Sequence, residues 1–120
     1  MRPIKLIIKT NESRYPIVIG SNLIAKLSMI VNQNSITFNK CLFLIDQKVP
    51  NKLIINLKKS FKKKKVFFLY LKANEKNKNQ KTINRILEFL LRSNFSRQDC
   101  LIAVGGGITG DIGGFVSSLF

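Results

Sequence analysis

Histidine and tryptophan are absent from this chain of 120 residues, and only six residues are acidic. Without histidine, the chain alone cannot build a Ser-His-Asp or Cys-His catalytic unit, an imidazole acid–base catalyst or a histidine-ligated metal site. The two cysteines, Cys41 and Cys100, form no CxxC motif and lie far apart in the sequence. They are typical of reduced thiols in a cytoplasmic protein rather than of a disulfide framework.

Long apolar runs are also missing. The first five residues carry charge but lack the apolar stretch and the cleavage site of a signal peptide. The apolar runs elsewhere are only a few residues long, far short of the ~20 residues that span a bilayer. We therefore expect a cytoplasmic protein with no membrane partner, and its length predicts a single domain that can bury a core without disulfides or a structural metal.

Basic residues dominate the charge, because 21 lysines and arginines give a net charge of +15. Such a charge is typical of proteins that bind nucleic acid or anionic membranes. Lysine, isoleucine and asparagine all have A/T-rich codons, however, so an AT-biased genome would produce the same composition. The only dense cluster, Lys58–Lys65, has no aromatic residues alternating with its lysines as base-stacking residues do. We interpret it as the solvated end of a helix, and a basic nucleic-acid-binding module is the alternative class.

The hydrophobic pattern predicts strands that alternate with helices. Two β-branched runs, Ile4–Lys9 and Tyr15–Ile19, predict an N-terminal hairpin, and turn residues separate them. Continuous apolar runs are typical of strands buried on both faces of a sheet. They occur at Cys41–Ile45, Val66–Leu71 and Leu101–Val104. Helices are predicted from periodic apolar residues at Leu23–Ile30, after Pro50 and at Thr82–Leu91. This order predicts an α/β fold, a Rossmann-like parallel-sheet nucleotide-binding domain with an N-terminal β-hairpin.

The carboxyl ends of the predicted parallel strands form the candidate site, because ligands of such sheets bind at this edge. Three segments follow these strand ends: the residues from Asp46 onward, Lys72–Lys78 and Gly105–Asp111. We expect them to converge.

A glycine-rich segment follows the third strand. Gly105–Gly110 (GGGITG) satisfies G-x-G-x-x-G and precedes a predicted helix. Glycine permits positive φ and close approach of a phosphate, and the amides at a helix start bind that anion. In the usual dinucleotide motif, however, the glycines follow the first strand and an acidic residue stands about 20 positions later. A tight strand–helix turn without a ligand is the alternative.

The longer run Gly105–Phe115 (GGGITGDIGGF) resembles the GGGxxGDxxGF signature of the 3-dehydroquinate synthase family. Three earlier segments resemble family segments in the same order, so that the resemblance spans nearly the whole chain. These are RYPI at 14–17, LIDQKV at 44–49 and NEKNKN at 74–79. Asp111 and the pair Gly114-Phe115 favour this family over metal-dependent polyol dehydrogenases. Those dehydrogenases and other sugar-phosphate cyclases are the enzyme alternatives.

The resemblance implies an enzyme, a carbon–oxygen lyase of the shikimate pathway. It implies conversion of 3-deoxy-D-arabino-heptulosonate 7-phosphate to 3-dehydroquinate and phosphate with NAD and a zinc or cobalt ion. The cofactor-binding residues it implies are Asp46 at the adenosine ribose, Glu75 and Lys78 at the nucleotide, the backbone of Gly106, Gly107, Ile108, Thr109 and Gly110 at the pyrophosphate and nicotinamide ribose, and Asp111 at the ribose or nicotinamide side.

Simpler structural roles are open for some of these residues. Asp46 also suits the acidic position ahead of the helix that Pro50 opens, and Glu75 and Lys78 suit a solvated loop. Asn74 stands where the family usually has glycine. We expect the turn to survive there, because asparagine tolerates the left-handed conformation better than most residues.

The resemblance also implies what this chain does not supply. The metal ligands of the family, one glutamate and two histidines, lie in a later helical domain, as do most cations that hold the substrate phosphate. We therefore expect no catalytic residue and no metal ligand here, and no activity of the chain alone. We expect residues 1–120 to form the N-terminal NAD-binding α/β domain, truncated within the helix after the glycine-rich loop, with the helical metal-binding domain absent. The expected partners are NAD and a small sugar phosphate, not nucleic acid, with a homodimer in the intact enzyme.

Overall fold

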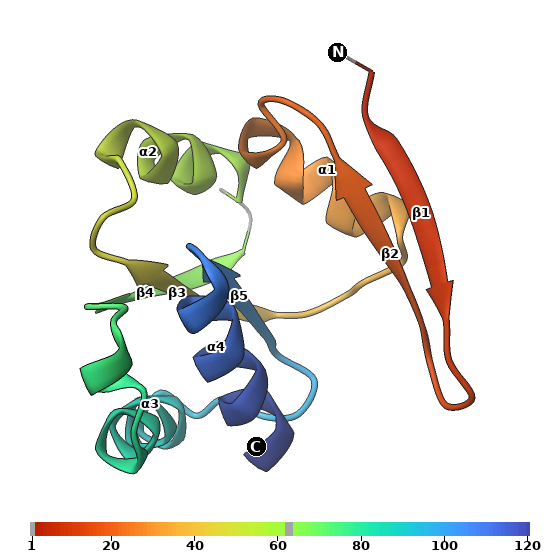
Figure 1. Cartoon of the computed structure of the whole chain (residues 1–120). Helices are drawn as coiled ribbons and strands as arrows, with labels where there is room; N and C mark the ends of the chain where they lie inside the picture. Colours follow the sequence, from red (N-terminus) through yellow and green to blue (C-terminus); the bar gives the residue numbers. More distant parts are fainter. Residues whose placement is uncertain (1, 62–63) are drawn as a thin grey trace.

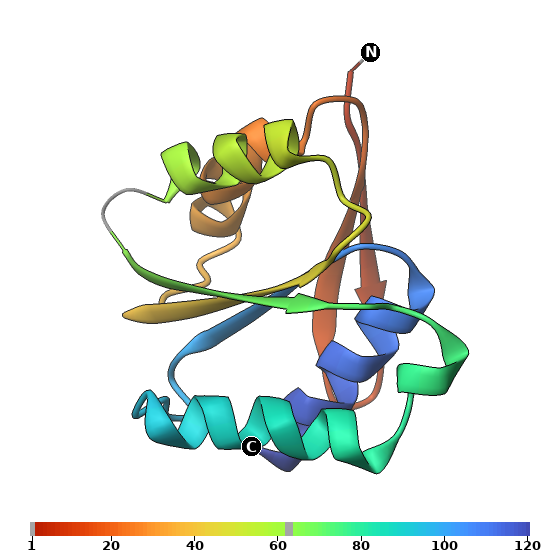
Figure 2. The same cartoon turned by 90° about the vertical axis from the view of Figure 1, so that its left-hand side faces the viewer.

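The computed structural model describes residues 2–61 and 64–120 and shows three layers, with a central sheet between two pairs of helices (Figures 1 and 2). In chain order the elements are the strands β1 (Ile4–Lys9) and β2 (Arg14–Ile19), the 3-10 turn η1 (Ile24–Lys26), α1 (Leu27–Gln33), β3 (Lys40–Asp46), α2 (Asn51–Ser60), β4 (Lys65–Leu71), the 3-10 turn η2 (Glu75–Asn77), α3 (Gln80–Arg92), β5 (Cys100–Val104) and α4 (Gly107–Leu119). The predicted α/β fold with a parallel sheet and an N-terminal hairpin is confirmed.

The central sheet has the strand order β4-β3-β5, and both strand pairs are parallel. The chain moves from β3 outward to β4 and then crosses back over β3 to β5. The two crossovers run in opposite directions across the sheet. Because both have the same handedness, their helices lie on opposite faces of the sheet. Accordingly α2 lies on one face and α3 on the other (Figure 2).

Strand β3 forms the centre of both hydrophobic cores. Its residues Cys41–Ile45 are completely buried, and alternate side chains point to opposite faces. Leu42 and Leu44 pack with α3 and α4, whereas Phe43 and Ile45 pack with α2 and with residues of η1 and α1. The prediction of a strand buried on both faces is therefore confirmed for β3.

The same prediction is wrong for β4 and β5. Within the described chain they are the edges of the central sheet, and most of their side chains are only half-buried. Leu71 is the fully buried residue of β4, and Tyr70 is exposed. An apolar run reports how hydrophobic the surroundings of a strand are, but it does not report whether a neighbouring strand lies on each side.

The N-terminal segments differ in one detail from the prediction. The hairpin is confirmed, with Ile4 opposite Ile19 and Lys9 opposite Arg14. The predicted helix over Leu23–Ile30 is instead divided into the 3-10 turn η1 and the helix α1, which meet at Lys26 and Leu27. Of the helices in the described ranges, none has the length and apolar character needed to cross a membrane.

Lysines of the basic cluster cover aromatic rings of the two cores. The ammonium groups of Lys58, Lys64 and Lys65 lie 4.8 Å, 5.0 Å and 5.8 Å from the ring centroids of Phe68, Phe38 and Phe67, respectively. Cations at such distances are attracted to the ring face. These contacts give the three lysines a structural role. Lys62 and Lys63, which belong to the same predicted cluster, lie outside the described residues.

Asp99 ties the starts of β3 and β5 together at the amino edge of the sheet. Its Oδ1 accepts a hydrogen bond from the backbone N–H of Lys40 (3.0 Å), and its Oδ2 accepts one from the N–H of Ser96 (2.8 Å). Partial desolvation opposes the charged form. The hydrogen bonds from Ser96 and Lys40 together outweigh it and lower the pKa of this carboxyl.

We therefore expect Asp99 to make the stability of the fold pH-dependent. Because the pKa is lower in the folded chain, the added stability is present above the unfolded pKa of about 4. It is lost as the pH falls below that value through the folded pKa. Near neutral pH, Asp99→Asn should lower the free energy of unfolding by about 1 kcal/mol, the size of one hydrogen bond. Urea titrations of the wild-type chain and of Asp99→Asn at pH 7 and pH 3 test this. A difference between their free energies of unfolding that is as large at pH 3 as at pH 7 would contradict it.

Candidate functional site

The three segments predicted to converge do lie at one edge of the sheet. Strands β3, β4 and β5 are parallel and end at Asp46, Leu71 and Val104. The chain leaves β3 toward β4 but returns to β5 on the other side, so that the strand order reverses between β3 and β5. Open parallel sheets bind ligands at such a reversal, beyond the carboxyl ends of the strands. Asp46 and Gly105 flank this position.

Gly105 packs so closely against its neighbours that only glycine fits. Its φ is +155°, and a Cβ placed there would lie 2.6 Å from Oγ1 of Thr109 and 3.0 Å from Cβ of Asp46. Thr109 is completely buried, and among the described residues its hydroxyl oxygen has no hydrogen-bond partner. Gly105 therefore brings the end of β5 against the side chain of Asp46.

The segment predicted as a glycine loop is mostly helical, which corrects the sequence interpretation. Helix α4 begins at Gly107, so that Gly107–Gly110 and Asp111 occupy its first turns. Gly106 is the extended residue before the helix, and because it has no side chain it leaves the helix start without a side-chain cap. The first amides of a helix have no partner within the helix, and they attract anions.

The surface around this helix start is open. A Cβ on Gly106, Gly107 or Gly110 would meet nothing within 4 Å. The side chain of Ile108, in contrast, packs against the core shared with α3, and that of Thr109 is buried. These five positions can therefore offer a ligand their backbone, whereas the two side chains among them, those of Ile108 and Thr109, serve the fold.

Asp46 forms a local turn rather than the start of a helix. Its Oδ1 accepts a hydrogen bond from the N–H of Lys48 (3.2 Å), and its carbonyl accepts one from the N–H of Val49 (3.0 Å). Helix α2 begins only at Asn51, after Pro50, and has no acidic residue in its first turn. The structure therefore does not support the alternative role as a helix-terminal acid. In the described chain Oδ2 of Asp46 accepts no hydrogen bond, and the half-buried side chain lies beside Gly105.

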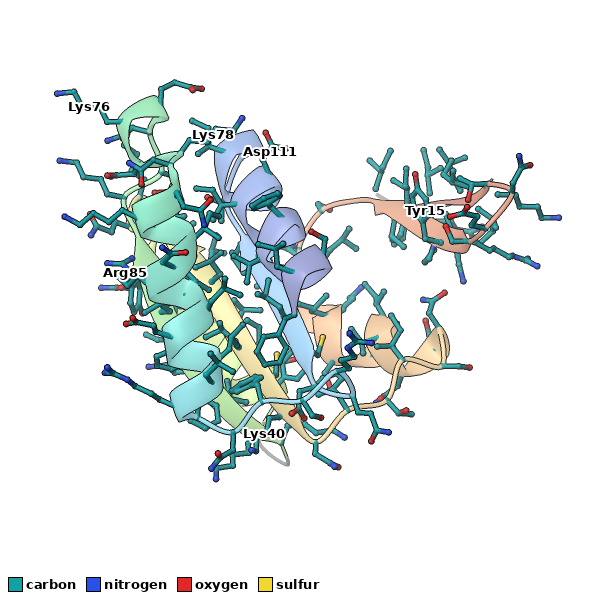
Figure 3. The ribbon with its side chains drawn as sticks, turned by 90° about the horizontal axis from the view of Figure 1, so that it is seen from below. Tyr15, Lys40, Lys76, Lys78, Arg85 and Asp111 are labelled. Carbon is teal, nitrogen blue, oxygen red and sulfur yellow. The ribbon has the colours of Figure 1, made fainter. Side chains whose placement is uncertain are left out.

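Lys78 and Asp111 form an ion pair, which the sequence analysis missed. The ammonium of Lys78 donates a hydrogen bond to Oδ2 of Asp111 at 3.0 Å, joining the segment after β4 to helix α4 (Figure 3). The hydrogen bond and the charge of Asp111 raise the pKa of Lys78, and Glu75 adds a smaller attraction. The opposite charges at one sheet edge were the available signal for this pair.

The turn between β4 and α3 is held by asparagine side chains. Asn74 is extended, with φ −143°, so the expected left-handed conformation is wrong. Its Oδ1 instead accepts a hydrogen bond from the N–H of Asn77 (3.0 Å), and Asn79 caps α3 in the same way through the N–H of Thr82 (3.0 Å). These caps explain how the turn forms without the glycine usual in the family.

A groove of about 320 Å³ lies between this turn and α4. It is lined by Lys78, Asn79, Gln80, Ile83, Asp111, Ile112 and Phe115. The predicted site residues thus form two groups at the carboxyl edge. Asp46 and Thr109 gather around Gly105, whereas Lys78 and Asp111 border the groove, near Glu75. The first turns of α4 contribute to both.

The described residues do not fit a metal centre. Within residues 2–61 and 64–120, no three His, Cys, Asp or Glu side chains come together as ligands. The two groups at the carboxyl edge instead suit a ligand with anionic and hydroxyl groups. Together with the glycine-lined helix start at the strand reversal, this defines a parallel α/β domain of the type that binds nucleotides.

Comparison with known proteins shows which enzymes this chain resembles. The family model for the N-terminal part of 3-dehydroquinate synthase matches residues 68–120. The 3-dehydroquinate synthase of Pelagibacter ubique is 47% identical over 117 residues, which cover 98% of this chain and 32% of the relative. The Streptococcus equi enzyme of the same name is 32% identical over 114 residues, covering 94% and 31%. The chain is similar to 3-dehydroquinate synthases over nearly its whole length and spans about a third of the length of these curated relatives.

The fold also matches that of a related cyclase. The crystal structure of a 2-deoxy-scyllo-inosose synthase, complexed with carbaglucose-6-phosphate, NAD+ and Co2+, superimposes with a TM-score of 0.83 at 19% identity. The match covers 98% of this chain and 32% of that one. At this identity the likeness concerns the fold alone.

Two adjacent glycines should respond differently to alanine. Gly105→Ala places a Cβ against Thr109 and Asp46 at an unfavourable φ, and we expect it to lower the free energy of unfolding by about 2 kcal/mol. Gly106→Ala is the matched control, because its Cβ enters open space. We expect it to change stability by less than about 0.5 kcal/mol. Urea denaturation of both variants tests this, and equal stabilities would contradict it.

Proposed function

We propose that residues 1–120 form the N-terminal NAD-binding domain of a 3-dehydroquinate synthase, and that the intact enzyme converts 3-deoxy-D-arabino-heptulosonate 7-phosphate to 3-dehydroquinate and phosphate. The observation that carries this proposal is the uncapped, glycine-lined start of α4, placed beside Asp46 at the strand reversal. The similarity to enzymes of that name supports it.

The helix start suits the pyrophosphate of NAD. The amides of Gly107, Ile108 and Thr109 occupy the first turn of α4, where the helix dipole favours negative charge. The missing side chains of Gly106, Gly107 and Gly110 leave room for phosphate oxygens to approach the backbone. In this proposal, backbone donors hold the pyrophosphate.

Asp46 suits a ribose. A carboxylate at the end of a strand can accept hydrogen bonds from both hydroxyls of the adenosine ribose, and it repels a 2′-phosphate. Its Oδ1 is oriented by the N–H of Lys48, and Oδ2 is available within the described chain. Asp46 therefore favours NAD over its phosphorylated counterpart.

Lys78, Glu75 and Asp111 suit the remaining polar groups of the nucleotide. Because Lys78 neutralises Asp111 at 3.0 Å, this carboxylate can lie near a phosphate with less repulsion than an isolated acid. Asp111 then accepts hydrogen bonds from hydroxyl or amide groups on the nicotinamide side. Glu75, exposed at the start of η2, faces the same edge.

When bound, NAD supplies reversible acceptance of a hydride from the substrate, and this chain contributes position and charge around it. For the zinc or cobalt ion of the family, in contrast, the described residues offer no ligand set. The proposal therefore assigns the metal, the catalytic residues and most of the sugar-phosphate contacts to other parts of the intact enzyme. It further takes that enzyme to be cytoplasmic, since NAD and sugar phosphates are cytoplasmic metabolites, and to be a homodimer, as the family resemblance implies.

We expect the isolated chain to bind NAD weakly, through the start of α4. In 15N–1H NMR spectra, NAD should shift the amides of residues 106–111 and of Asp46 and Lys48. Gly107→Ala should stabilise the helix by about 0.5 kcal/mol, yet weaken NAD binding ~10-fold, since its Cβ occupies the phosphate approach. Gly114→Ala is the matched control, because it lies on α4 in equally open space two turns away.

Two results would overturn the assignment of the site. One is a set of NAD-induced shifts centred away from the carboxyl edge of the sheet. The other is Gly107→Ala binding NAD as tightly as Gly114→Ala. Phosphorylated NAD offers a further comparison, because its affinity should rise toward that of NAD when Asp46→Asn removes the carboxylate.

We also expect the chain alone to release no phosphate from the heptulosonate substrate with NAD and zinc or cobalt added. The reaction needs a metal ion to polarise the oxidised oxygen and cations to hold the phosphate, and histidine is absent from this sequence. A phosphate-release assay tests this, with a full-length bacterial homologue as the positive control. Turnover that disappears in the Asp46→Asn variant would show that the chain is catalytic by itself.

A further inference from the structure

The two cysteines, far apart in the sequence, are direct neighbours in the fold. Cys41 on β3 pairs in register with Cys100 on β5, and the two strands are parallel. Both side chains point to the face of the sheet that packs with α2. Neighbouring strands lie about 4.8 Å apart, and disulfides join Cα atoms that are about 4.4–6.8 Å apart. The register therefore satisfies the backbone requirement for a disulfide, although both thiols are free in this structure.

The two thiols differ in accessibility. Cys41 is completely buried beneath α2 and the aromatic residues of that core. Cys100 is half-buried and lines two adjoining hollows at the amino edge of the sheet, of about 470 Å³ and 780 Å³. Arg97 and Asp99 line both hollows as well. Cys100 is therefore the partly exposed member of the pair, whereas Cys41 has no exposed surface.

The thiols also differ in acidity, and the more exposed thiol, that of Cys100, is the more acidic one. The neighbouring Cys41 thiol lowers the pKa of the Cys100 thiol, although desolvation opposes this. The same contact and burial raise the pKa of Cys41 above its usual range. Thiolate is the nucleophile in disulfide exchange, so Cys100 attacks first and Cys41 resolves.

We propose that Cys41 and Cys100 form a redox-active thiol pair that is oxidised by a small anionic disulfide, such as glutathione disulfide, to an intramolecular disulfide between β3 and β5. The Cys100 thiolate attacks one sulfur of the small disulfide, forming a mixed disulfide and expelling one thiolate. Cys41 then attacks the Cys100 sulfur and transfers its proton to the departing thiolate, so that the second half of the small disulfide leaves as a thiol. Two protein thiols are thereby oxidised, and one small disulfide is reduced to two thiols. The net charge of +15 favours an anionic oxidant.

This pair is separate from the proposed NAD site. It lies at the amino end of the β3–β5 pairing, whereas Asp46 and Gly105 follow its carboxyl end. The disulfide would close a loop that contains α2, β4 and α3, and such a link restricts the unfolded chain. Oxidation should therefore raise the urea midpoint of unfolding without changing the NMR shifts that NAD induces. The inference does not depend on the proposed function.

The test is incubation of the purified chain with glutathione disulfide at pH 8, followed by mass spectrometry. We expect the wild-type chain to lose two hydrogens, retain no glutathione and remain monomeric. Cys41→Ser should stop at a glutathione adduct on Cys100, and Cys100→Ser should remain unmodified because its only thiol is buried. The variants form a matched pair, since each replaces one sulfur by oxygen.

Three outcomes would overturn the proposal. The first is a stable glutathione adduct on the wild-type chain, and the second is a wild-type chain that stays reduced over the whole range of glutathione redox ratios. The third is equal reactivity of the two single-cysteine variants, with Cys41 in folded Cys100→Ser reacting as fast as Cys100 in Cys41→Ser. Alkylation of the oxidised wild-type chain gives a check that needs no variant. Both cysteines should be protected from a maleimide together and released together by a reductant.

Discussion

The parallel pairing of β3 with β5 is the constraint on which the features at both edges of the central sheet depend, the candidate site at the carboxyl edge and the two thiols at the amino edge. Its register runs from Cys41 opposite Cys100 to Ile45 opposite Val104. One step beyond the carboxyl end, Asp46 meets the turn at Gly105, and at the amino end the two thiols meet. In a parallel pair, a shift of one residue would turn every side chain of a strand to the opposite face. The buried positions of Leu42 and Leu44 on one face and Phe43 and Ile45 on the other exclude that shift.

The glycines of the α4 segment divide into two kinds, and the motif alone does not distinguish them. Gly105 and Gly113 serve the fold: a Cβ on Gly113 would lie 3.1 Å from Cβ of Ala103 and 3.2 Å from Leu101, so its absence lets α4 lie close to β5. Gly106, Gly107 and Gly110 touch nothing at that position. Glycine in a helix costs about 1 kcal/mol relative to alanine. A ligand at the helix start explains Gly106, Gly107 and Gly110, whereas Gly114, which also meets nothing within 4 Å, lies outside the proposed site.

Local patterns in the sequence were sufficient for most of the elements and for the convergence of three segments at one edge of the sheet, but not for contacts between distant segments. The apolar runs of β3, β4 and β5 look alike, and only the strand order shows that β3 alone is central within the described sheet. The glycine signature predicted the start of α4 to within a few residues. The pairing of Lys78 with Asp111, and of Cys41 with Cys100, required the three-dimensional arrangement, because nothing in the spacing of either pair fixes it. Asn74 shows a further limit, since a side-chain cap replaced the backbone conformation expected from glycine.

The ion pair at the groove illustrates how the site can be both ordered and open to a ligand. The side chains of Lys78 and Asp111 are 43% and 63% exposed, and ion pairs as exposed as this one contribute little to stability. Lys78 can therefore leave Asp111 for a phosphate at little cost, and Asp111 can then accept a hydrogen bond from a hydroxyl. Without a ligand, Asp111 keeps the lysine oriented toward the start of α4, where the helix dipole favours an anion and three glycines, Gly106, Gly107 and Gly110, leave room for it. A stronger, buried pair at this position would oppose binding, so the weakness of the pair suits a cofactor site.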